Sequence, residues 1–243
     1  MESDLSGKYT FDILPSEVDF KGKLTLPNLT NYILNAAGYH ACECGFGMSE
    51  INQSNRSWVL SRLVIEMMSY PKQYEKIQVQ TWVENVMRMF TMRNFAIMDE
   101  EGKILGYART VWAMIDLITR KPSDLTQTNI PDFICKKECP IEKSGKIPFL
   151  EGKPKEKFTI KYSDIDINQH LTSSKYVEHI IDAFNLKMFE KREIHRFEIE
   201  FMSEGKFGET ISLYKEDNTD NEFFIELKNE AGNTLSKSKM TFS

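Results

Sequence analysis

Residues 164–170 read Asp-Ile-Asp-Ile-Asn-Gln-His, and the segment 171–176, Leu-Thr-Ser-Ser-Lys-Tyr, follows directly. A carboxylate, a carboxamide and an imidazole alternate at Asp166, Asn168 and His170. Because alternate residues of an extended segment share one face, we expect these three side chains to converge on one pocket. The same spacing also fits a turn with side-chain capping ahead of a helix.

The chain around this block predicts one helix and several strands. Ser173 or Ser174 is placed to cap a helix. Its apolar residues recur at helical spacing, and they are Val177, Ile180, Ile181, Phe184 and Met188. Alternating or β-branched runs predict strands over residues 158–162, 194–202, 209–215, 222–228 and 234–242.

The first half of the chain repeats this order. A helix is predicted from Pro27 to Gly45 or Gly47, and strands are predicted over 9–14, 58–68, 76–83, 89–98 and 104–115. Asp19 aligns with Asp166 at the same offset that aligns Leu24 with Leu171. Any two strand-rich halves can be aligned loosely. The shared order of one helix and a four-strand meander nevertheless favours an internal duplication of a unit of about 100 residues.

A unit of this kind wraps an antiparallel sheet around one long helix, which is an α+β architecture. We therefore predict an N-terminal unit over residues 1–116 and a C-terminal unit, with the polar block, over residues 157–243. The proline-rich segment 117–156 is predicted to be a linker or a connection over the surface. The wrapped sheet leaves a tunnel-like apolar space that suits an extended acyl chain.

The composition is that of an ordinary soluble globular protein, with 41% hydrophobic and 28% charged residues. A net charge of −5 does not suggest nucleic-acid binding, because phosphate contacts need a basic face. No apolar run is long enough for a transmembrane helix. Residues 1–8 are polar and lack the apolar core of a signal peptide, so we expect a protein of the prokaryotic cytoplasm.

The four cysteines are expected to be ordinary thiols in that reducing compartment. They are Cys42, Cys44, Cys135 and Cys139. Zinc ligands usually lie two to four residues apart, and one of the two pairs does not fit that spacing, so a metal site is the less favoured alternative. No cofactor is expected.

Several segments carry a family resemblance. Asp164 to His170 fits the pattern D-x-D-x-N-x-H, and Tyr176 follows in the next helix. The other matching segments are Trp58 to Arg62 with Tyr70-Pro71 behind it, Thr81-Trp82-Val83, Val111-Trp112-Ala113-Met114 and Leu117-Ile118-Thr119-Arg120. Together they resemble the acyl-acyl carrier protein thioesterases, a double hot-dog family with plant plastid and bacterial members. The resemblance covers nearly the whole chain, and the D-x-N-x-H block is its most specific part.

The resemblance implies two tandem hot-dog units that hydrolyse the thioester between a fatty acyl group and the phosphopantetheine arm of acyl carrier protein. The family's catalytic Asp, Asn and His map onto Asp166, Asn168 and His170. A further acid of the family maps onto Glu204, and Gly205 stands where the plant enzymes have a cysteine. That departure argues against a cysteine nucleophile here. A monomer or a homodimer is compatible with the sequence.

Thioester hydrolysis needs a water nucleophile, a base and a donor for the developing oxyanion. Glu204 or His170 would take a proton from water. Asn168 would polarise the carbonyl or hold the water, and Asp166 would orient its neighbours. Backbone N–H groups near Ser173 to Lys175 would supply an oxyanion hole. The sequence is compatible both with direct attack by water and with attack by Glu204 through an anhydride.

In the first unit Lys21 and Lys23 stand where Asn168 and His170 stand, so one reactive site per chain is expected. Substrate binding is assigned to Trp58, Arg62, Trp82, Trp112 and Tyr176. Plain core packing is the alternative at each tryptophan. Basic residues for docking the acidic carrier protein are expected at Arg120, Lys121, Lys136 and Lys137, although a solvated face explains those charges equally well.

Two other functions fit the same residues. One is an acyl-CoA thioesterase of the same fold, which differs in its rates on carrier-protein and CoA thioesters. The other is a hot-dog protein that binds acyl thioesters without turnover, which releases no thiol.

Overall fold

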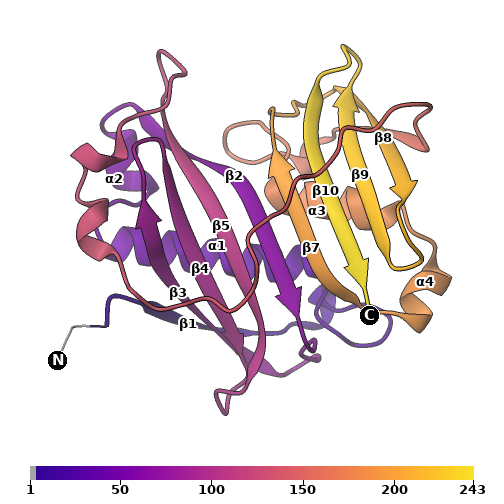
Figure 1. Cartoon of the computed structure of the whole chain (residues 1–243), viewed down its shortest axis with the longest axis horizontal. Coiled ribbons are helices and arrows are strands. Elements are labelled where there is room, and N and C mark those ends of the chain that lie inside the picture. Colours follow the sequence, from indigo (N-terminus) through magenta and orange to yellow (C-terminus); the bar gives the residue numbers. More distant parts are fainter. Residues whose placement is uncertain (1–3) are drawn as a thin grey trace. The chain divides into compact units, whose positions relative to one another are not determined.

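The computed structural model describes residues 4–243, so the first three residues of the polar N-terminal stretch lie outside it. The chain forms two compact units that divide between Lys143 and Ser144 (Figure 1). This boundary lies inside the segment 117–156 that the sequence assigned to a linker. In each unit, strands of one antiparallel sheet are accompanied by a helix.

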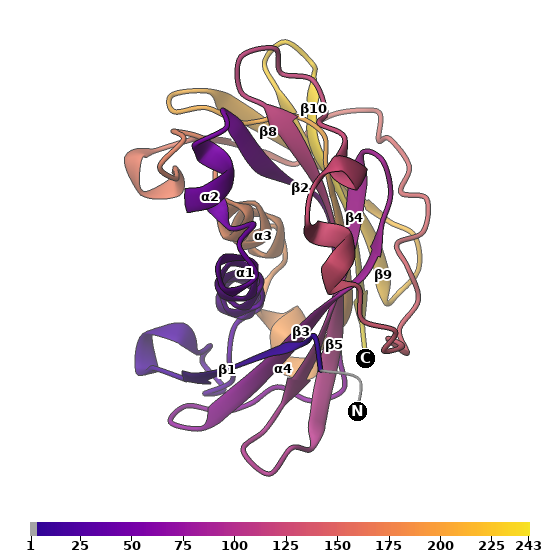
Figure 2. The ribbon, with the colours of Figure 1, turned by 90° about the vertical axis from the view of Figure 1, so that its left-hand side faces the viewer.

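The first unit contains α1 (Leu26–Glu43), the short α2 (Met48–Asn52) and the strands β1 (Gly7–Asp12), β2 (Arg56–Met67), β3 (Lys76–Val86), β4 (Phe90–Met98) and β5 (Ile104–Asp116). Its strand order is β1-β3-β4-β5-β2, and each neighbouring pair is antiparallel. Figure 2 shows α1 lying along one face of this sheet. Leu29, Ile33 and Ala36 of α1 are fully buried, because helical spacing puts them on the face that meets the strands.

The second unit contains α3 (Ser173–Asp182), α4 (Leu186–Lys191) and the strands β6 (Glu156–Thr159), β7 (Ile194–Phe201), β8 (Thr210–Asp217), β9 (Glu222–Asn229) and β10 (Thr234–Phe242). The strand order here is β6-β8-β9-β10-β7. It matches the order of the first unit when β6 to β10 are taken, in chain order, as the equivalents of β1 to β5. The two halves of the chain therefore share one topology, as an internal duplication requires.

The helices depart from the sequence prediction in three places. Thr172, and not Ser173 or Ser174, caps α3 by accepting the N–H of Lys175. Two helices, α3 and α4, form where one was predicted. Asn185 caps the second by accepting the N–H of Met188. Between the predicted helix that ends near Gly47 and the predicted strand 58–68, residues 48–52 form α2, which was not predicted.

The connection between the units is packed against the protein along its length. Short 3-10 helices at Leu125–Gln127 and Ile130–Phe133 bury Leu125 and Ile130 in a cluster with Met114 of the first unit. Two further 3-10 turns, Pro15–Glu17 and Tyr162–Asp164, precede α1 and α3.

Buried charges on the second sheet hold the later part of this connection. Oε2 of Glu226 accepts the N–H of Leu150 (2.5 Å), and Nζ of Lys237 donates to the carbonyl of Ile147 (2.7 Å). Glu226 is fully buried and Lys237 nearly so. A buried carboxylate is tolerable only when hydrogen bonds and a counter-charge compensate it. Here Nζ of Lys228 lies 3.4 Å from Glu226.

All four cysteines are free thiols. Within residues 4–243, no cluster of three or more His, Cys, Asp or Glu side chains is arranged to hold a metal ion. Over the same residues, no helix combines the length and the apolar character that crossing a membrane requires.

Replacing Glu226 by Ala tests the role of the buried charge. We expect the unfolding free energy to fall by about 3 kcal/mol, because the change leaves a buried N–H and an ammonium uncompensated. Urea denaturation measures the loss, and faster tryptic cleavage after Lys146 or Lys153 reports detachment of the connection. Glu151→Ala, at an exposed neighbouring position, is the control. Equal stability of the two variants would contradict this account.

Candidate active site

The block 164–170 forms a closed turn, and not the extended segment that the alternation predicted. Asp166 donates its N–H to the carbonyl of His170, and the carbonyl of Asp166 accepts the N–H of Gln169, both at 2.9 Å. Oδ1 of Asp166 accepts the N–H groups of Asn168 (2.8 Å) and His170 (3.1 Å). Gln169 takes a left-handed φ of 63°, which reverses the chain ahead of His170. One carboxylate thus fixes the turn.

Main-chain pairing joins this turn to the segment that follows β7. His170 forms an antiparallel bridge with Lys206, and Leu171 donates its N–H to the carbonyl of Gly205 (2.8 Å). The pairing places Nε2 of His170 3.3 Å from Oε2 of Glu204. The two side chains keep 25% and 35% of their surface exposed, so water and substrate can reach them.

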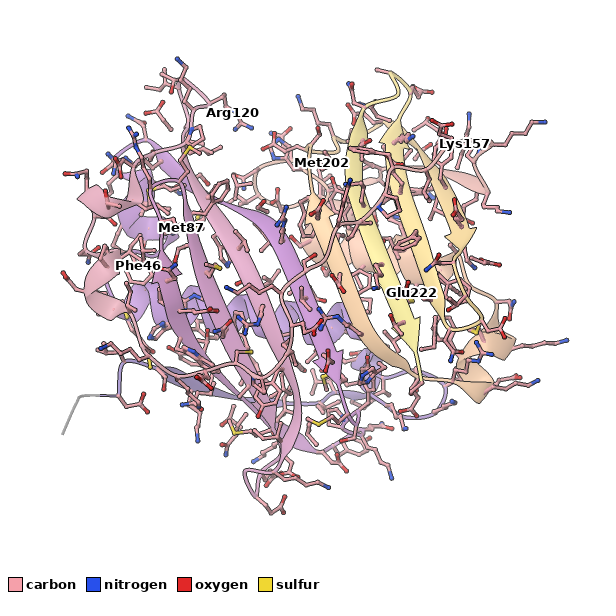
Figure 3. The ribbon with its side chains drawn as sticks, viewed as in Figure 1. Phe46, Met87, Arg120, Lys157, Met202 and Glu222 are labelled. Carbon is pink, nitrogen blue, oxygen red and sulfur yellow. The ribbon has the colours of Figure 1, made fainter. Side chains whose placement is uncertain are left out.

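Tyr176 holds the segment that carries Glu204. This segment begins at Met202, the residue after β7 that is labelled in Figure 3. The Tyr176 hydroxyl donates to the carbonyl of Ser203 (3.2 Å) and accepts the N–H of Gly205 (3.1 Å), so it grips the chain on both sides of Glu204. Burial raises the pKa of Tyr176 to about 12. Tyr176, predicted to bind substrate, is buried, and its hydroxyl contacts the segment that carries Glu204.

Gly205 lies in a crowded place, which accounts for the absence of a larger side chain. A Cβ at this position would lie 2.8 Å from Cδ1 of Ile160 and 3.2 Å from Cδ1 of Leu235. A side chain the size of cysteine would overpack this corner of the core. Cys42, Cys44, Cys135 and Cys139 all belong to the first unit.

Asn168 and the start of α3 make up the rest of the predicted site. Nδ2 of Asn168 lies 3.5 Å from Oδ2 of Asp166, and the amide is exposed. At the helix start, the N–H of Lys175 is occupied by the carbonyl of Thr172 (3.0 Å). In the described part of the chain, the N–H groups of Ser173 and Ser174 have no such acceptor, so these two can serve an oxyanion.

The first unit builds the same turn with different side chains. Oδ1 of Asp19 accepts the N–H groups of Lys21 (2.8 Å) and Lys23 (3.0 Å). Gly22 has a φ of 72°, and Lys23 bridges Lys72 as an isolated antiparallel pair. The turn, its carboxylate and its bridge are therefore duplicated. Lysines take the places of the amide and the imidazole, so the chemistry of the second unit is not repeated.

The first unit contains an apolar cavity of about 200 Å³ that is partly open to solvent. Trp58 of β2 and Trp112 of β5 line it together with Phe46 (labelled in Figure 3) and Leu34 of α1. β4 also contributes to this wall. Its Thr91 lies opposite Trp112 in the pairing of β4 with β5, and both residues line the cavity. Two of the three tryptophans predicted to bind substrate are thus cavity residues.

The other substrate residues predicted in this unit lie elsewhere. Trp82 is fully buried outside the cavity, packs with Val64 and Ala96, and donates Nε1–H to the carbonyl of Lys137 (2.8 Å). Core packing therefore accounts for Trp82. Arg62 is exposed and follows an irregularity in the pairing of β2 with β5.

A buried basic pair, of which one member lines the cavity, was not predicted from the sequence. Arg93 of β4 lines the cavity, and its Nη1 donates to Nδ1 of His40 on α1 (2.8 Å). Burial and the neighbouring guanidinium lower the pKa of His40 to about 4. Nε2 of His40 lies 3.6 Å from Sγ of Cys44. Because Nδ1 accepts from Arg93, Nε2 carries the ring proton, so His40 cannot act as a base toward this thiol.

Comparison with known proteins identifies the family. Residues 5–133 match the model of the acyl-ACP thioesterase N-terminal domain, and residues 150–243 match that of the acyl-ACP thioesterase C-terminal domain. The chain belongs to the acyl-ACP thioesterase family. The resemblance noted in the sequence is therefore confirmed.

Solved structures of acyl-ACP thioesterases have the same fold. A crystal structure of an acyl-ACP thioesterase from Bacteroides thetaiotaomicron is 46% identical, covers 100% of both chains and has a TM-score of 0.96. A 12:0-ACP thioesterase from Umbellularia californica is 19% identical over 98% of this chain and 97% of its own, with a TM-score of 0.88. The predicted α+β double hot-dog fold is confirmed.

A plant relative shows how much of a longer protein this chain matches. The palmitoyl-acyl carrier protein thioesterase of Gossypium hirsutum is 27% identical over 229 residues, which are 87% of this chain and 55% of the plant protein. The chain thus spans about half the length of this relative and of several other plant relatives.

Replacing Tyr176 by Phe tests whether its hydroxyl positions Glu204. We expect kcat for thioester hydrolysis to fall about tenfold and the unfolding free energy to fall by about 1–2 kcal/mol, because two buried hydrogen bonds are lost. KM should stay unchanged if Tyr176 does not touch substrate. Tyr39→Phe removes an exposed hydroxyl and serves as the control. A rise in KM with normal kcat would return Tyr176 to substrate binding.

The depressed pKa of His40 predicts a loss of stability in acid. Above pH 6.5 the ring is neutral in both folded and unfolded chains. Between pH 6.5 and pH 4 only the unfolded chain gains the proton, so the unfolding free energy falls by about 2–3 kcal/mol over this window. Urea denaturation of wild type and His40→Gln at several pH values isolates this share. Parallel curves for the two proteins would contradict it.

Proposed function

We propose that the chain hydrolyses the thioester of a fatty acyl group carried by acyl carrier protein, which releases a free fatty acid and ends chain elongation. The observation that carries this proposal is the solvent-accessible pair of His170 and Glu204, in a chain of the acyl-ACP thioesterase family. Its 46% identity over full length to the Bacteroides protein supports the same reaction class.

The proposed chemistry uses water, one base and several hydrogen-bond donors. A neutral His170 that donates from Nε2 to Glu204 keeps Nδ1 as its acceptor. Water loses a proton to His170 Nδ1 or to Glu204 as its oxygen bonds to the thioester carbon. N–H groups at the start of α3 and the Asn168 amide stabilise the oxyanion. The C–S bond then breaks, and the thiolate takes up the proton from the base.

Asp166 acts on this reaction through structure and not through contact with substrate. Both of its carboxylate oxygens face the turn, one toward two backbone N–H groups and the other toward the Asn168 amide. The carboxylate therefore orients Asn168 and His170. This is the positioning role that the sequence suggested for it.

The acyl chain is proposed to lie in the apolar cavity of the first unit. Trp58 and Trp112 offer aromatic wall, and Leu34 offers an aliphatic one. An apolar pocket with few polar groups is the usual form of a site for such a ligand. The first unit, which lacks the reactive side chains, would then serve binding.

Acyl carrier protein is the proposed partner, and the cytoplasm of a bacterium the proposed compartment. The Bacteroides relative is bacterial, whereas the curated plant relatives are described as chloroplastic. Arg120, Lys121, Lys136 and Lys137 are all exposed on the first unit, as docking of an acidic protein requires.

Single substitutions separate the roles of His170 and Glu204. We expect His170→Ala to lower kcat by about 100- to 10,000-fold, as loss of a general base does. Glu204→Gln keeps an acceptor for Nε2–H but is not a base. A loss as large as that of His170→Ala would assign the base to Glu204, whereas a loss of about tenfold would assign it to His170. Glu190→Gln, exposed on α4, is the control.

Thiol release from palmitoyl-acyl carrier protein and from palmitoyl-CoA is the direct assay. Faster release from the carrier protein supports the proposal, and faster release from CoA would make the chain an acyl-CoA thioesterase. Binding of both thioesters without any thiol release would show a binding protein. Full activity in both His170→Ala and Asn168→Ala would remove the site proposed here.

A further inference from the structure

The cavity of the first unit is apolar apart from one cation. Among the residues that line it, Thr91 and Arg93 bear polar side chains. The Thr91 hydroxyl donates a hydrogen bond to the carbonyl of Asn85 (3.1 Å). The Arg93 side chain comes from the inner face of β4, where Val83 of β3 lies opposite it and also lines the cavity. A guanidinium therefore stands in a wall that is otherwise suited to hydrocarbon.

Protein acceptors satisfy only part of this guanidinium. Arg93 is 5% exposed, and in the described part of the chain its two hydrogen bonds both come from Nη1. One goes to Nδ1 of His40 (2.8 Å) and the other to Oγ1 of Thr81 (3.2 Å). The Nε and Nη2 side of the fork has no protein acceptor among residues 4–243.

The surroundings also leave the guanidinium of Arg93 without a carboxylate in contact with it. Within residues 4–243, no carboxylate lies within 4 Å of the guanidinium. His40 is neutral at pH 7, and burial lowers the pKa of Arg93 to about 10, so Arg93 is still a cation there. At the C-terminal end of α1, the Glu43 carboxylate acts electrostatically on His40 and accepts the Tyr9 hydroxyl (2.6 Å), and the helix terminus adds a partial negative charge. A buried cation without an anion is costly.

We infer that this cavity binds a medium-chain carboxylate, with the carboxylate on Nε and Nη2 of Arg93 and the alkyl chain along the apolar wall. Two parallel N–H groups of a guanidinium match the two oxygens of a carboxylate. The methyl end of a thioester-linked chain offers no acceptor, so it leaves the cation unpaired. A free acid of the same length pairs it.

Carboxylate binding in this cavity affects the proposed reaction. The fatty acid released by hydrolysis is itself a carboxylate with an alkyl chain, so it would compete with substrate for the cavity. This inhibition rests on the proposed function, whereas carboxylate binding does not. The two ideas can therefore fail separately.

Calorimetric titration of the intact wild-type chain at pH 7.5 gives the first test. The probes are octanoate and octan-1-ol, which share chain length and differ in charge. We expect octanoate to bind about tenfold to a hundredfold more tightly, the usual strength of a hydrogen-bonded ion pair. Equal affinities for the two probes would overturn the inference without any variant.

Substitution of Arg93 gives the second test. Arg93→Met should bring octanoate affinity down to that of octan-1-ol, and Arg93→Lys, which keeps the charge but loses the fork, should fall between. Leu34→Ala is the matched control, because it removes wall without removing charge and should weaken both probes alike. A preference for octanoate that survives in a folded Arg93→Met would overturn the assignment of the anion to Arg93.

Steady-state kinetics separates this inference from the proposed function. Octanoate should act as a competitive inhibitor of thioester hydrolysis in wild type, and Arg93→Met should be about tenfold or more less sensitive. Octanoate binding in a chain that releases no thiol would leave the carboxylate site standing and remove the thioesterase. Thiol release that octanoate does not inhibit, in a chain that does not bind it, would do the reverse.

Discussion

The carboxylate of Asp166 is the constraint on which the site depends. A turn this tight leaves the N–H groups of Asn168 and His170 without main-chain partners, and Oδ1 of Asp166 accepts both. An unpaired backbone donor costs about as much as a lost hydrogen bond, so the acid decides whether the turn closes. With the turn closed, His170 pairs with Lys206, and Glu204 is brought to the imidazole as a result. The reactive pair is thus set by backbone geometry.

The two units solve one folding problem and then differ in what they bury. Their strand orders correspond, and the turn before each long helix has the same bonds. The first unit places a guanidinium, hydrogen-bonded to a neutral imidazole, in the wall of an apolar cavity. The second places carboxylates and an ammonium on its sheet, where they hold the connecting segment. Equal topology therefore carries unequal electrostatics.

The sequence predicted the elements well because alternation and helical spacing reflect burial directly. The sequence also carried a signal for the face of Trp82, which the substrate-binding assignment did not use. In β3, Thr81 and Val83 share one side, so Trp82 must point to the other, and only family resemblance placed it in the pocket. The break between α3 and α4 had a signal as well, since Asn185 interrupts the apolar pattern and is a good cap.

Other features could not be predicted because they depend on contacts between distant residues. The Arg93–His40 bond joins positions 53 residues apart, and no local pattern marks either partner. The left-handed Gln169 is unusual for a side chain of this size, whereas Gly22 at the matching position is expected. The approach of Glu204 to His170 needed either the fold or the family. Spacing alone placed Asp166 and His170 together for a reason, extended alternation, that proved wrong.

The turn has a consequence for how such a chain can evolve. The bonds that close it join main-chain N–H groups to one aspartate, so they do not depend on the side chains at positions 21 and 23, or 168 and 170. Reactive groups can therefore be lost or acquired there without refolding the loop. After duplication, one copy could give up chemistry and adapt its interior to a ligand while the other kept the reaction. Because a single acid closes each turn, the two copies can take on different functions with little loss of stability in the turn.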